Sequence, residues 1–288
     1  TVASVVQSFK RKVLTLAGFE VEPYGGERPQ WFDYPNGSRI WVGGMDNPSK
    51  VLSQELDGVY VNQCEELELE DWSGDGREFV VCSSGTSALQ LALESFDFKR
   101  GSEVIVPEFT MIACARAVTM AGLKPVFVDC REDMLIDPGL IEEKVTVNTV
   151  AVMPVHVYGR RCDMEKISEI AKRRRLKVVE DLAEAHGVAI HEDSDAGCYS
   201  FYKNKIVHGE EGGAVSFKRD GTAYSARSLR SLGFTDRHDF LHRPGGMNAR
   251  MSDVHASLVL DNLREFDESV RKRADVAAWY KKHLPREW

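Results

Sequence analysis

Three short segments of the sequence carry residue types that could build a ligand site. The first is a turn of small residues between a β-rich run and an amphipathic run, Ser83-Ser84-Gly85-Thr86-Ser87-Ala88. The free N–H groups at a helix N-terminus attract anions, and the hydroxyl groups of the turn add further donors. Many α/β turns have this composition. The turn lacks the lysine of a P-loop, so a nucleoside triphosphate is not its expected ligand.

The other two segments are Glu180-Asp181, which ends the run KVVED, and Lys205, which follows a β-rich run. Ligands of open parallel sheets bind beyond the carboxyl ends of the strands, where a carboxylate could pair with a cationic ring nitrogen. A partly desolvated lysine can form a Schiff base with a carbonyl. Taken singly, Asp181 could be a helix N-cap and Lys205 a surface lysine. The three segments in this order are the parts that a pyridoxal phosphate site needs.

Alternating strands and helices must position these residues. After residue 76, β-rich and amphipathic runs alternate, which predicts an α/β fold of three layers, α/β/α, with a mostly parallel central sheet. The predicted strands cover residues 78–82, 103–106, 125–129, 150–158, 177–181, 198–202 and 214–218. The predicted helices cover residues 87–96, 111–121, 164–175 and 252–284.

From about residue 79 to its end, the chain resembles the DegT-type sugar aminotransferases, which belong to the fold type I group of pyridoxal phosphate enzymes. The resemblance is carried by an ordered set of motifs: SSGTSALQLAL, GSEVIVPEFTMIACARAV, GLKPVFVDC, PVHVYGRRCDM, VVEDLAEAHG, GCYSFYKNK, EEGGAVSF and MNARMSDVHASL. It implies a large domain with the fold of pyridoxal phosphate-dependent transferases, and pyridoxal 5'-phosphate as the cofactor.

The resemblance also implies a role for each matching residue. Lys205 would form the Schiff base and then move a proton, Asp181 would pair with the ring nitrogen, and Glu184 would bind the ring hydroxyl. His186 is interpreted as structural. The cofactor phosphate would be held by Gly85, Thr86, Ser87 and Ser200 and, from the second subunit of a homodimer, by Asn248.

Two positions depart from the family pattern. Met111 stands where the family has an aromatic side chain stacked on the cofactor ring, and its sulfur would pack there more weakly. Glu210 stands where the family motif threonine-glycine-glutamate-glycine-glycine has its first glycine. If that glycine has a positive φ, Glu210 would cost about 1–2 kcal/mol.

The first quarter of the chain resembles part of the ATPase domain of a phage terminase large subunit. Residues 59–66 (VYVNQCEE) resemble its Walker B strand, with Glu65 and Glu66 as the carboxylate candidates. No Walker A motif accompanies them, so we expect a non-catalytic, phage-derived remnant. We therefore predict a terminase-like segment (1–75), a cofactor-binding large domain (76–250) and a long helix (251–288). This helix would lead toward a small C-terminal domain that is missing.

The composition limits the partners and the compartment. The 37 Lys and Arg against 45 Asp and Glu leave a net charge of −8, which argues against nucleic acid or an anionic membrane as a partner. No window approaches the length of a membrane span, and no signal peptide is evident. The six cysteines show no zinc-ligand spacing, so we predict no metal site and expect reduced thiols in the cytoplasm.

The leading hypothesis is an aminotransferase that transfers an amino group, with glutamate as the donor, to a keto sugar nucleotide. Three alternatives stay open: an inactive cofactor-binding protein of the same fold, a fragment of a DNA-packaging ATPase, and a sugar dehydratase of the same family. Dehydratases of this family usually carry histidine at the lysine position, and Lys205 therefore argues against the last. The sugar, the nucleotide and the aminated carbon do not follow from the sequence.

Overall fold

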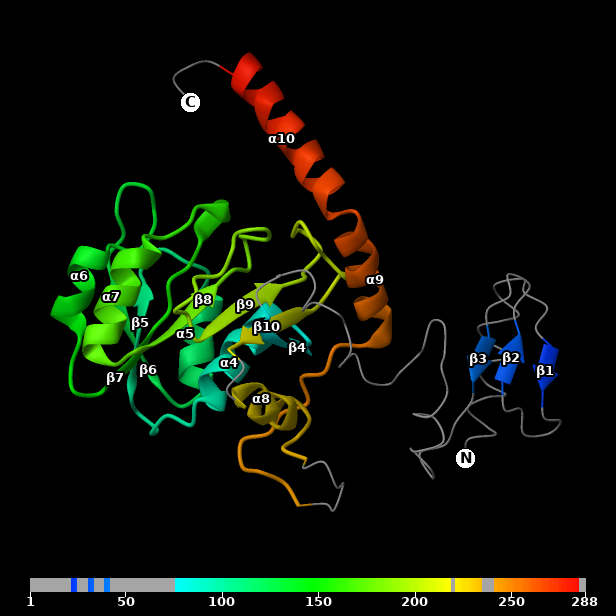
Figure 1. Cartoon of the computed structure of the whole chain (residues 1–288), viewed down its shortest axis with the longest axis horizontal. Helices are drawn as coiled ribbons and strands as arrows, with labels where there is room; N and C mark the ends of the chain where they lie inside the picture. Colours follow the sequence, from blue (N-terminus) through cyan, green and yellow to red (C-terminus); the bar gives the residue numbers. More distant parts are fainter. Residues whose placement is uncertain are drawn as a thin grey trace. The chain divides into compact units, whose positions relative to one another are not determined.

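The computed structural model describes residues 76–218, 221–234 and 241–284, together with the backbone of three short strands nearer the N-terminus. The chain divides into two compact units, Thr1–Val61 and Asn62–Trp288. In the first unit, β1 (Glu22–Tyr24), β2 (Trp31–Asp33) and β3 (Arg39–Trp41) form an antiparallel sheet with β2 in the centre (Figure 1). The Walker B-like motif at residues 59–66 lies outside the described residues.

The second unit is built on a seven-stranded sheet with the order β4-β10-β9-β8-β7-β5-β6. All neighbours from β9 to β6 pair in parallel, whereas β10 is antiparallel to both β4 and β9. The strands are β4 (Glu78–Cys82), β5 (Glu103–Pro107), β6 (Lys124–Val128), β7 (Thr149–Val152), β8 (Lys177–Asp181), β9 (Ala196–Ser200) and β10 (Gly213–Phe217). The predicted mostly parallel sheet is confirmed.

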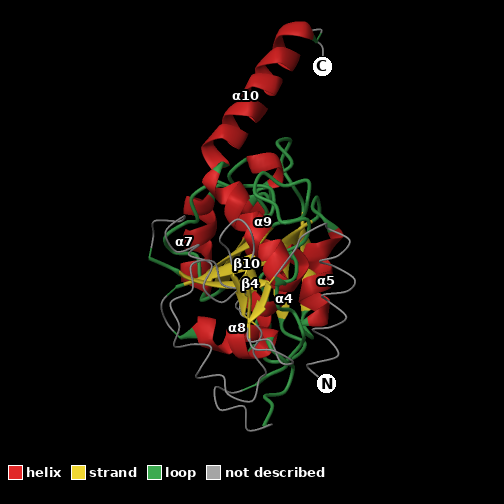
Figure 2. Ribbon diagram, turned by 90° about the vertical axis from the view of Figure 1, so that its right-hand side faces the viewer, coloured by secondary structure: helices red, strands yellow, loops and turns green. Residues whose placement is uncertain are grey.

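Helices cover both faces of this sheet, as expected when right-handed crossovers join parallel strands. Helices α4 (Gly85–Ser95), α5 (Ile112–Met120) and α8 (Thr222–Arg230) form one layer. Helices α6 (Pro138–Lys144), α7 (Met164–Arg174) and α9 (Asp253–Arg264) lie on the other face, and Figure 2 shows α5 and α7 on opposite sides of the strands. The three-layer α/β/α fold is therefore confirmed.

Alternation along β4 shows how the sheet divides the core. Val80 and Cys82 join the large cluster that includes the buried side chains of α4, whereas Phe79 and Val81 join a second cluster beneath α9. All four side chains are almost fully buried. Although β4 is an edge strand of the sheet, helices cover both of its faces, so its side chains are apolar in succession rather than alternating with polar ones.

Two predicted elements differ from the observed ones. The strand predicted at residues 150–158 ends at Val152, because Pro154 has no N–H to continue the ladder and Tyr158 adopts a left-handed φ of 54° in a short 3-10 turn, Val157–Gly159. The helix predicted at residues 252–284 is two helices, α9 and α10 (Phe266–His283), which meet at Glu265 with φ −99° and ψ 13°.

Two short helices were not predicted. Helix α6 carries the usual start signals, since Asp137 caps it and Pro138 occupies its first position. Helix α8 begins after Gly221, which has a φ of 87° and no capping side chain, so the sequence offers no N-cap signal there.

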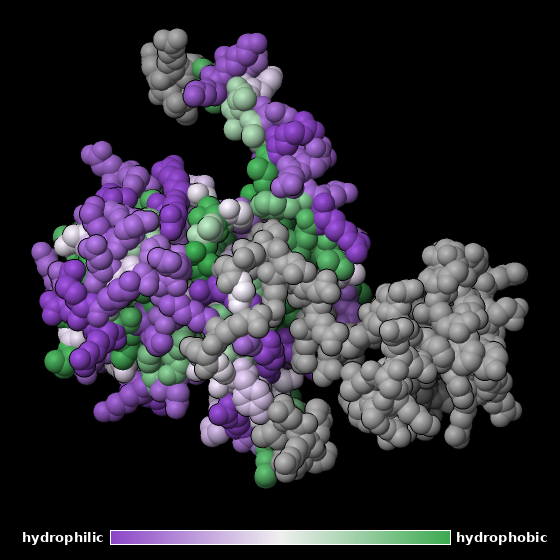
Figure 3. Space-filling view, in the orientation of Figure 1, coloured by the Kyte–Doolittle hydropathy of each residue, from purple (hydrophilic) through white to green (hydrophobic). Residues whose placement is uncertain are grey.

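Helix α10 buries none of its residues, and Figure 1 shows it projecting away from the sheet. Exposed apolar side chains lie on both C-terminal helices, among them Val254 and Leu258 on α9 and Val276 and Trp279 on α10 (Figure 3). None of the described helices combines the length and the apolar character that crossing a bilayer requires.

Candidate active site

The carboxyl ends of β8 and β9 bring the predicted acid and lysine together. Asp181 is the last residue of β8 and pairs with Cys198 of the neighbouring strand β9, which ends at Ser200. The loop that follows Ser200 carries Lys205, and the positive charge of its side chain acts on the carboxylate of Asp181. Both residues therefore lie at or beyond the carboxyl ends of neighbouring strands, where open α/β sheets bind their ligands.

The turn between β4 and α4 approaches the same edge. A Cβ atom on Gly85 would lie 2.7 Å from Cβ and 3.1 Å from Oγ of Ser200, which is closer than a side chain tolerates. Only glycine therefore lets the first turn of α4 lie against the end of β9. The predicted phosphate residues Gly85 and Ser200 are direct neighbours, although 115 positions separate them in the sequence.

Serine hydroxyl groups cluster at the start of α4. Ser84 is the N-cap, and its Oγ accepts a hydrogen bond from the N–H of Ser87 at 3.1 Å. Oγ of Ser87 lies 3.0 Å from Oγ of Ser84 and 3.1 Å from Oγ of Ser83. Thr86 follows Gly85 in the first helical turn and is partly exposed. The N-terminus of α4 therefore presents helical N–H groups and several hydroxyls to an anion.

Asp181 is 5% exposed, and both of its carboxylate oxygens accept hydrogen bonds. The N–H of Ala183 donates to Oδ1 at 2.9 Å, and the thiol of Cys114 donates to Oδ2 at 3.1 Å. Burial raises the pKa of Asp181, while the two donors and the positive charge of Lys205 act in the opposite direction. The next described element after Asp181 is the strand β9 and not a helix, so the alternative of an N-cap is wrong.

Glu180 turns to the opposite face of β8 from Asp181, as the alternation of a strand requires. Its Oε2 lies 2.7 Å from Nε2 of His156, and neither side chain is exposed. Nδ1 of His156 accepts from the N–H of Cys162, so Nε2 carries the proton and donates to Glu180. Burial is the largest single effect and raises the pKa of Glu180. The hydrogen bond and charge of His156, together with hydrogen bonds from Ser194 and His191, outweigh it, so the net shift of the pKa is downward.

Lys205 pairs with Glu184 inside the site. Nζ of Lys205 lies 3.5 Å from Oε1 of Glu184, and the two side chains are 16% and 29% exposed. The other oxygen of Glu184 accepts from the N–H of Tyr158 at 3.0 Å. Tyr158 is the residue with the left-handed φ described above. The structure therefore joins two predicted site residues, Glu184 and Lys205, through a contact that the sequence analysis did not foresee.

The loop that carries Lys205 folds back on itself before β10. The N–H of Lys203 donates to the carbonyl of Glu210 at 3.1 Å, and the N–H of Gly209 donates to the carbonyl of Phe201 at 2.9 Å. Glu210 has a φ of 66°. The conditional expectation of a positive φ at this position is confirmed, and the strain of about 1–2 kcal/mol lies in the loop that presents the lysine.

His186 contacts and stabilises the loop that carries Lys205. Its Nδ1 accepts from the N–H of Val207 at 3.0 Å, and its ring packs against the rings of Tyr199 and Phe201. Burial lowers the pKa of His186 from 6.5 to about 4, so the ring is neutral at physiological pH. These contacts agree with the interpretation of His186 as a structural residue.

Met111 and Asn248 lie at the exposed margin of the domain. Met111 directly precedes α5 and is 65% exposed, so its stacking role stays a prediction. Asn248 is exposed, and the carbonyl of the next residue, Ala249, accepts from the N–H of Ser83 in the same chain at 2.8 Å. Its backbone therefore lies near the turn at residues 83–88 of its own chain, and its contribution from a second subunit stays a prediction.

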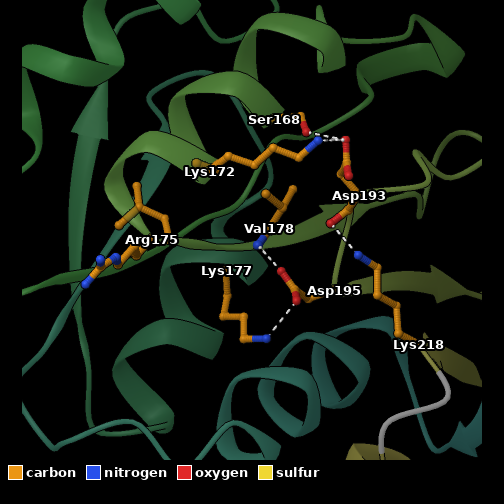
Figure 4. Close-up of a pocket in the computed structure, with 10 residues that line it drawn as sticks. Ser168, Lys172, Arg175, Lys177, Val178, Asp193, Asp195 and Lys218 are labelled. Atoms are coloured by element: carbon orange, nitrogen blue, oxygen red, sulfur yellow. Dashed lines mark hydrogen bonds and ion pairs between the residues drawn. The ribbon is translucent and has the colours of Figure 1, made fainter.

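A separate hollow of about 320 Å³ lies at the other end of the strands (Figure 4). Lys177, which begins β8, lines it, whereas Asp181 ends that strand. Its cations are largely paired: Lys172 lies 2.7 Å from Asp193, and Lys177 lies 2.8 Å from Asp195. It is therefore distinct from the Asp181–Lys205 site. Within the part of the chain that the structure describes, no three His, Cys, Asp or Glu side chains converge to hold a metal ion.

The sequence profile of the DegT/DnrJ/EryC1/StrS aminotransferase family matches residues 52–286. The chain belongs to this family. This match extends over residues 52–72, which belong to the segment predicted to be terminase-like. The predicted resemblance to a terminase is not shown by the known proteins compared with this chain. A fragment of a DNA-packaging ATPase is therefore not supported as an alternative.

Similar proteins include nucleotide-sugar aminotransferases. The chain is 38% identical over 213 residues to GDP-perosamine synthase from Caulobacter vibrioides, covering 72% of this chain and 57% of that protein. It is 40% identical over 208 residues to dTDP-3-amino-3,4,6-trideoxy-alpha-D-glucose transaminase from Micromonospora megalomicea, covering 70% and 55%. The chain thus spans less than two thirds of the length of these relatives.

Solved structures show the same relationship. The chain superposes on Streptomyces venezuelae DesV, solved with a ketimine intermediate, with a TM-score of 0.66 and 37% identity, covering 72% of this chain and 58% of that one. It superposes on Bacillus subtilis NtdA, solved with bound PMP, with a TM-score of 0.71 and 30% identity, covering 79% and 53%. The fold around the site is therefore that of pyridoxal phosphate-dependent aminotransferases.

Proposed function

We propose that the protein is a pyridoxal phosphate-dependent aminotransferase that aminates a keto sugar nucleotide, with glutamate as the amino donor. The observation that carries this proposal is that the buried carboxylate of Asp181 ends β8 and that Lys205, paired with Glu184, follows the end of the neighbouring strand β9. The close approach of Gly85 to Ser200 adds an anion-binding turn at the same edge of the sheet. Two relatives, one named as a GDP-perosamine synthase and one as a transaminase of a dTDP-linked amino sugar, support the substrate class.

The residues at the strand ends fit the cofactor. The N-terminus of α4 and the hydroxyls of Ser87 and Ser200 suit a phosphate group, and the absence of a side chain at Gly85 leaves the turn and β9 close enough to share it. A buried carboxylate at Asp181 suits a protonated ring nitrogen, and Lys205 suits an aldehyde. When bound, the cofactor supplies an electron sink that stabilises negative charge on the carbon bearing the amino group.

Each residue of the chain then has a distinct task. The amine of Lys205 would hold the cofactor and, once free, would carry a proton between the substrate carbon and the reacting carbon of the cofactor. Asp181 would accept a hydrogen bond from the ring N–H of the cofactor. Glu184 would bind the ring hydroxyl with the carboxylate that also accepts from the N–H of Tyr158. The low exposure of Lys205 limits the access of water during the transfer.

We also propose that the protein acts as a homodimer in the cytoplasm. Exposed apolar side chains surround the site, among them Met111 (65%), Ile112 (70%) and Tyr158 (67%). Burial of this surface by a second copy would bring Asn248 of the partner subunit within reach of the phosphate. The described cysteines are all free, which suits a reducing compartment.

The test begins with the purified protein and pyridoxal phosphate. Borohydride reduction followed by peptide mass spectrometry should find the cofactor on Lys205, and none in Lys205→Arg. Lys203→Arg, two positions away in the same loop, is the matched control and should label normally. Loaded protein should then convert glutamate to its keto acid and pass the amino group to a GDP-, dTDP- or UDP-linked keto sugar. The proposal would be contradicted if only other lysines were labelled. It would also be contradicted if the amino group taken from glutamate were transferred to none of these keto sugars.

A further inference from the structure

A chain of hydrogen bonds reaches Asp181 from the helix beneath the site. The Sγ atom of Cys114, in α5, lies 3.1 Å from Oδ2 of Asp181 and 3.2 Å from Oγ1 of Thr110. Cys114 is fully buried, and 67 positions separate it from the aspartate in sequence. The sequence analysis assigned no role to this cysteine.

The direction of the two hydrogen bonds follows from the chemistry of the groups. An ionised carboxylate can only accept, so the S–H of Cys114 must donate to Asp181. The sulfur is then left as the acceptor, and the hydroxyl of Thr110 donates to it. Burial, reinforced by the negative charge of Asp181, raises the pKa of Cys114, so the thiol keeps the proton that this arrangement needs.

We propose that Cys114 is a positioning residue that holds the Asp181 carboxylate in the orientation required by the cofactor ring nitrogen. This inference rests on the proposed function. With Ala183 on Oδ1 and Cys114 on Oδ2, the plane of the carboxylate is defined from both sides. A thiol is a weak donor, so Oδ2 retains most of its capacity to accept a second, stronger hydrogen bond from a ring N–H.

The first test uses protein without cofactor. The infrared S–H stretching band of Cys114 is isolated as the difference between wild type and Cys114→Ser. In Asp181→Asn this band should move to higher frequency, because a neutral amide accepts more weakly than a carboxylate. If the S–H band kept its frequency in Asp181→Asn, the proposal would be overturned. This outcome does not depend on whether the protein binds pyridoxal phosphate.

The second test measures the dissociation constant of pyridoxal phosphate. Cys114→Val, which fills the space without a donor, should weaken binding by about 3–10-fold. Cys114→Ser, which restores a donor, should return it to within about twofold of wild type. In the Asp181→Asn background the valine should have no further effect, since the partner of the thiol is already lost.

The outcomes separate this proposal from the proposed function. Wild type that binds no pyridoxal phosphate would reject the function, while the infrared comparison would still decide the hydrogen bond. The positioning role alone would be rejected if Cys114→Val bound pyridoxal phosphate as tightly as wild type. It would also be rejected if this substitution weakened binding equally in wild type and in Asp181→Asn. Should Cys114→Val fail to fold, the band shift in Asp181→Asn and the affinity of Cys114→Ser carry the test.

Discussion

Gly85 and Ser200 lie so close that a Cβ atom on residue 85 would come within 2.7 Å of Cβ of Ser200. This contact joins the first turn of α4 to the end of β9, and with them the anion-binding turn to the strand that leads to Lys205. In the proposed site, the separation of these two backbones would set the space available to a phosphate group.

Gly85→Ala should therefore damage both folding and cofactor binding. The added methyl group must push α4 away from β9, at a cost of about 1–3 kcal/mol in the free energy of unfolding. Urea denaturation measures this loss, and pyridoxal phosphate titration measures the accompanying loss of affinity.

The double variant Gly85→Ala with Ser200→Gly tests the cause. Removing Cβ of Ser200 relieves the shortest contacts, so part of the lost stability should return, although the hydroxyl is no longer available to the phosphate. Stability losses that simply add would contradict the assigned contact.

Glu210→Gly should stabilise the protein. Glu210 has a φ of 66°, where glycine is unstrained, and relief of this strain outweighs the greater flexibility of glycine in the unfolded chain. We expect a gain of up to about 1 kcal/mol in the free energy of unfolding. Glu211→Gly is the matched control: it changes the same charge at the next position, where φ is not positive, and should destabilise slightly. Equal effects of the two substitutions would rule out strain at Glu210.

His186 should make the protein less stable as the pH falls. Its folded-state pKa of about 4 lies below the ordinary value of 6.5, so between these pH values the unfolded chain binds a proton that the folded protein does not. Stability is therefore unaffected above pH 6.5 and is lost progressively down to about pH 4, by about 3 kcal/mol in total.

His186→Asn retains an acceptor near the N–H of Val207 but does not titrate. Urea unfolding at a series of pH values should give a curve that is flatter than that of wild type in this window. Parallel curves would show that His186 does not carry the pH dependence.

Glu184 should tolerate glutamine better than alanine. Glutamine loses the ion pair with Lys205, which is partly exposed and contributes about 0.5 kcal/mol, but it still accepts from the N–H of Tyr158. Alanine also leaves that N–H without its acceptor, and we expect a further loss of about 1 kcal/mol. The free energies of unfolding at low and high salt check this, since only the ion pair is screened. A larger loss for glutamine than for alanine would contradict the assigned contacts.

Local patterns were sufficient to locate Asp181. The run KVVED is a short apolar strand that ends in acids, and the observed β8 has the predicted limits, Lys177–Asp181. The same strand shows where local reasoning stops. Glu180 and Asp181 are adjacent acids in the sequence, and only the two faces of the sheet separate them, one toward His156 and the other toward Cys114.

The failures of the sequence analysis have local physical reasons. The strand predicted at residues 150–158 was too long because its apolar pattern continues past Pro154, although a proline cannot donate to the ladder. Helix α8 was missed because Gly221 gives it no capping side chain. The break at Glu265 leaves helical periodicity almost unchanged on both sides, so the pattern continues across it.

By itself, the sequence determined the alternation of strands and helices and the unusual residue at position 210. It also determined the order along the chain of the small-residue turn at 83–88, Asp181 and Lys205. These are properties of short segments, set by side-chain periodicity and by backbone preferences. Only the tertiary structure decided that Gly85 meets Ser200, that Lys205 pairs with Glu184 and that Cys114 donates to Asp181. Those contacts depend on the order of strands in the sheet and on which face each side chain takes, and neither follows from neighbouring residues in the chain.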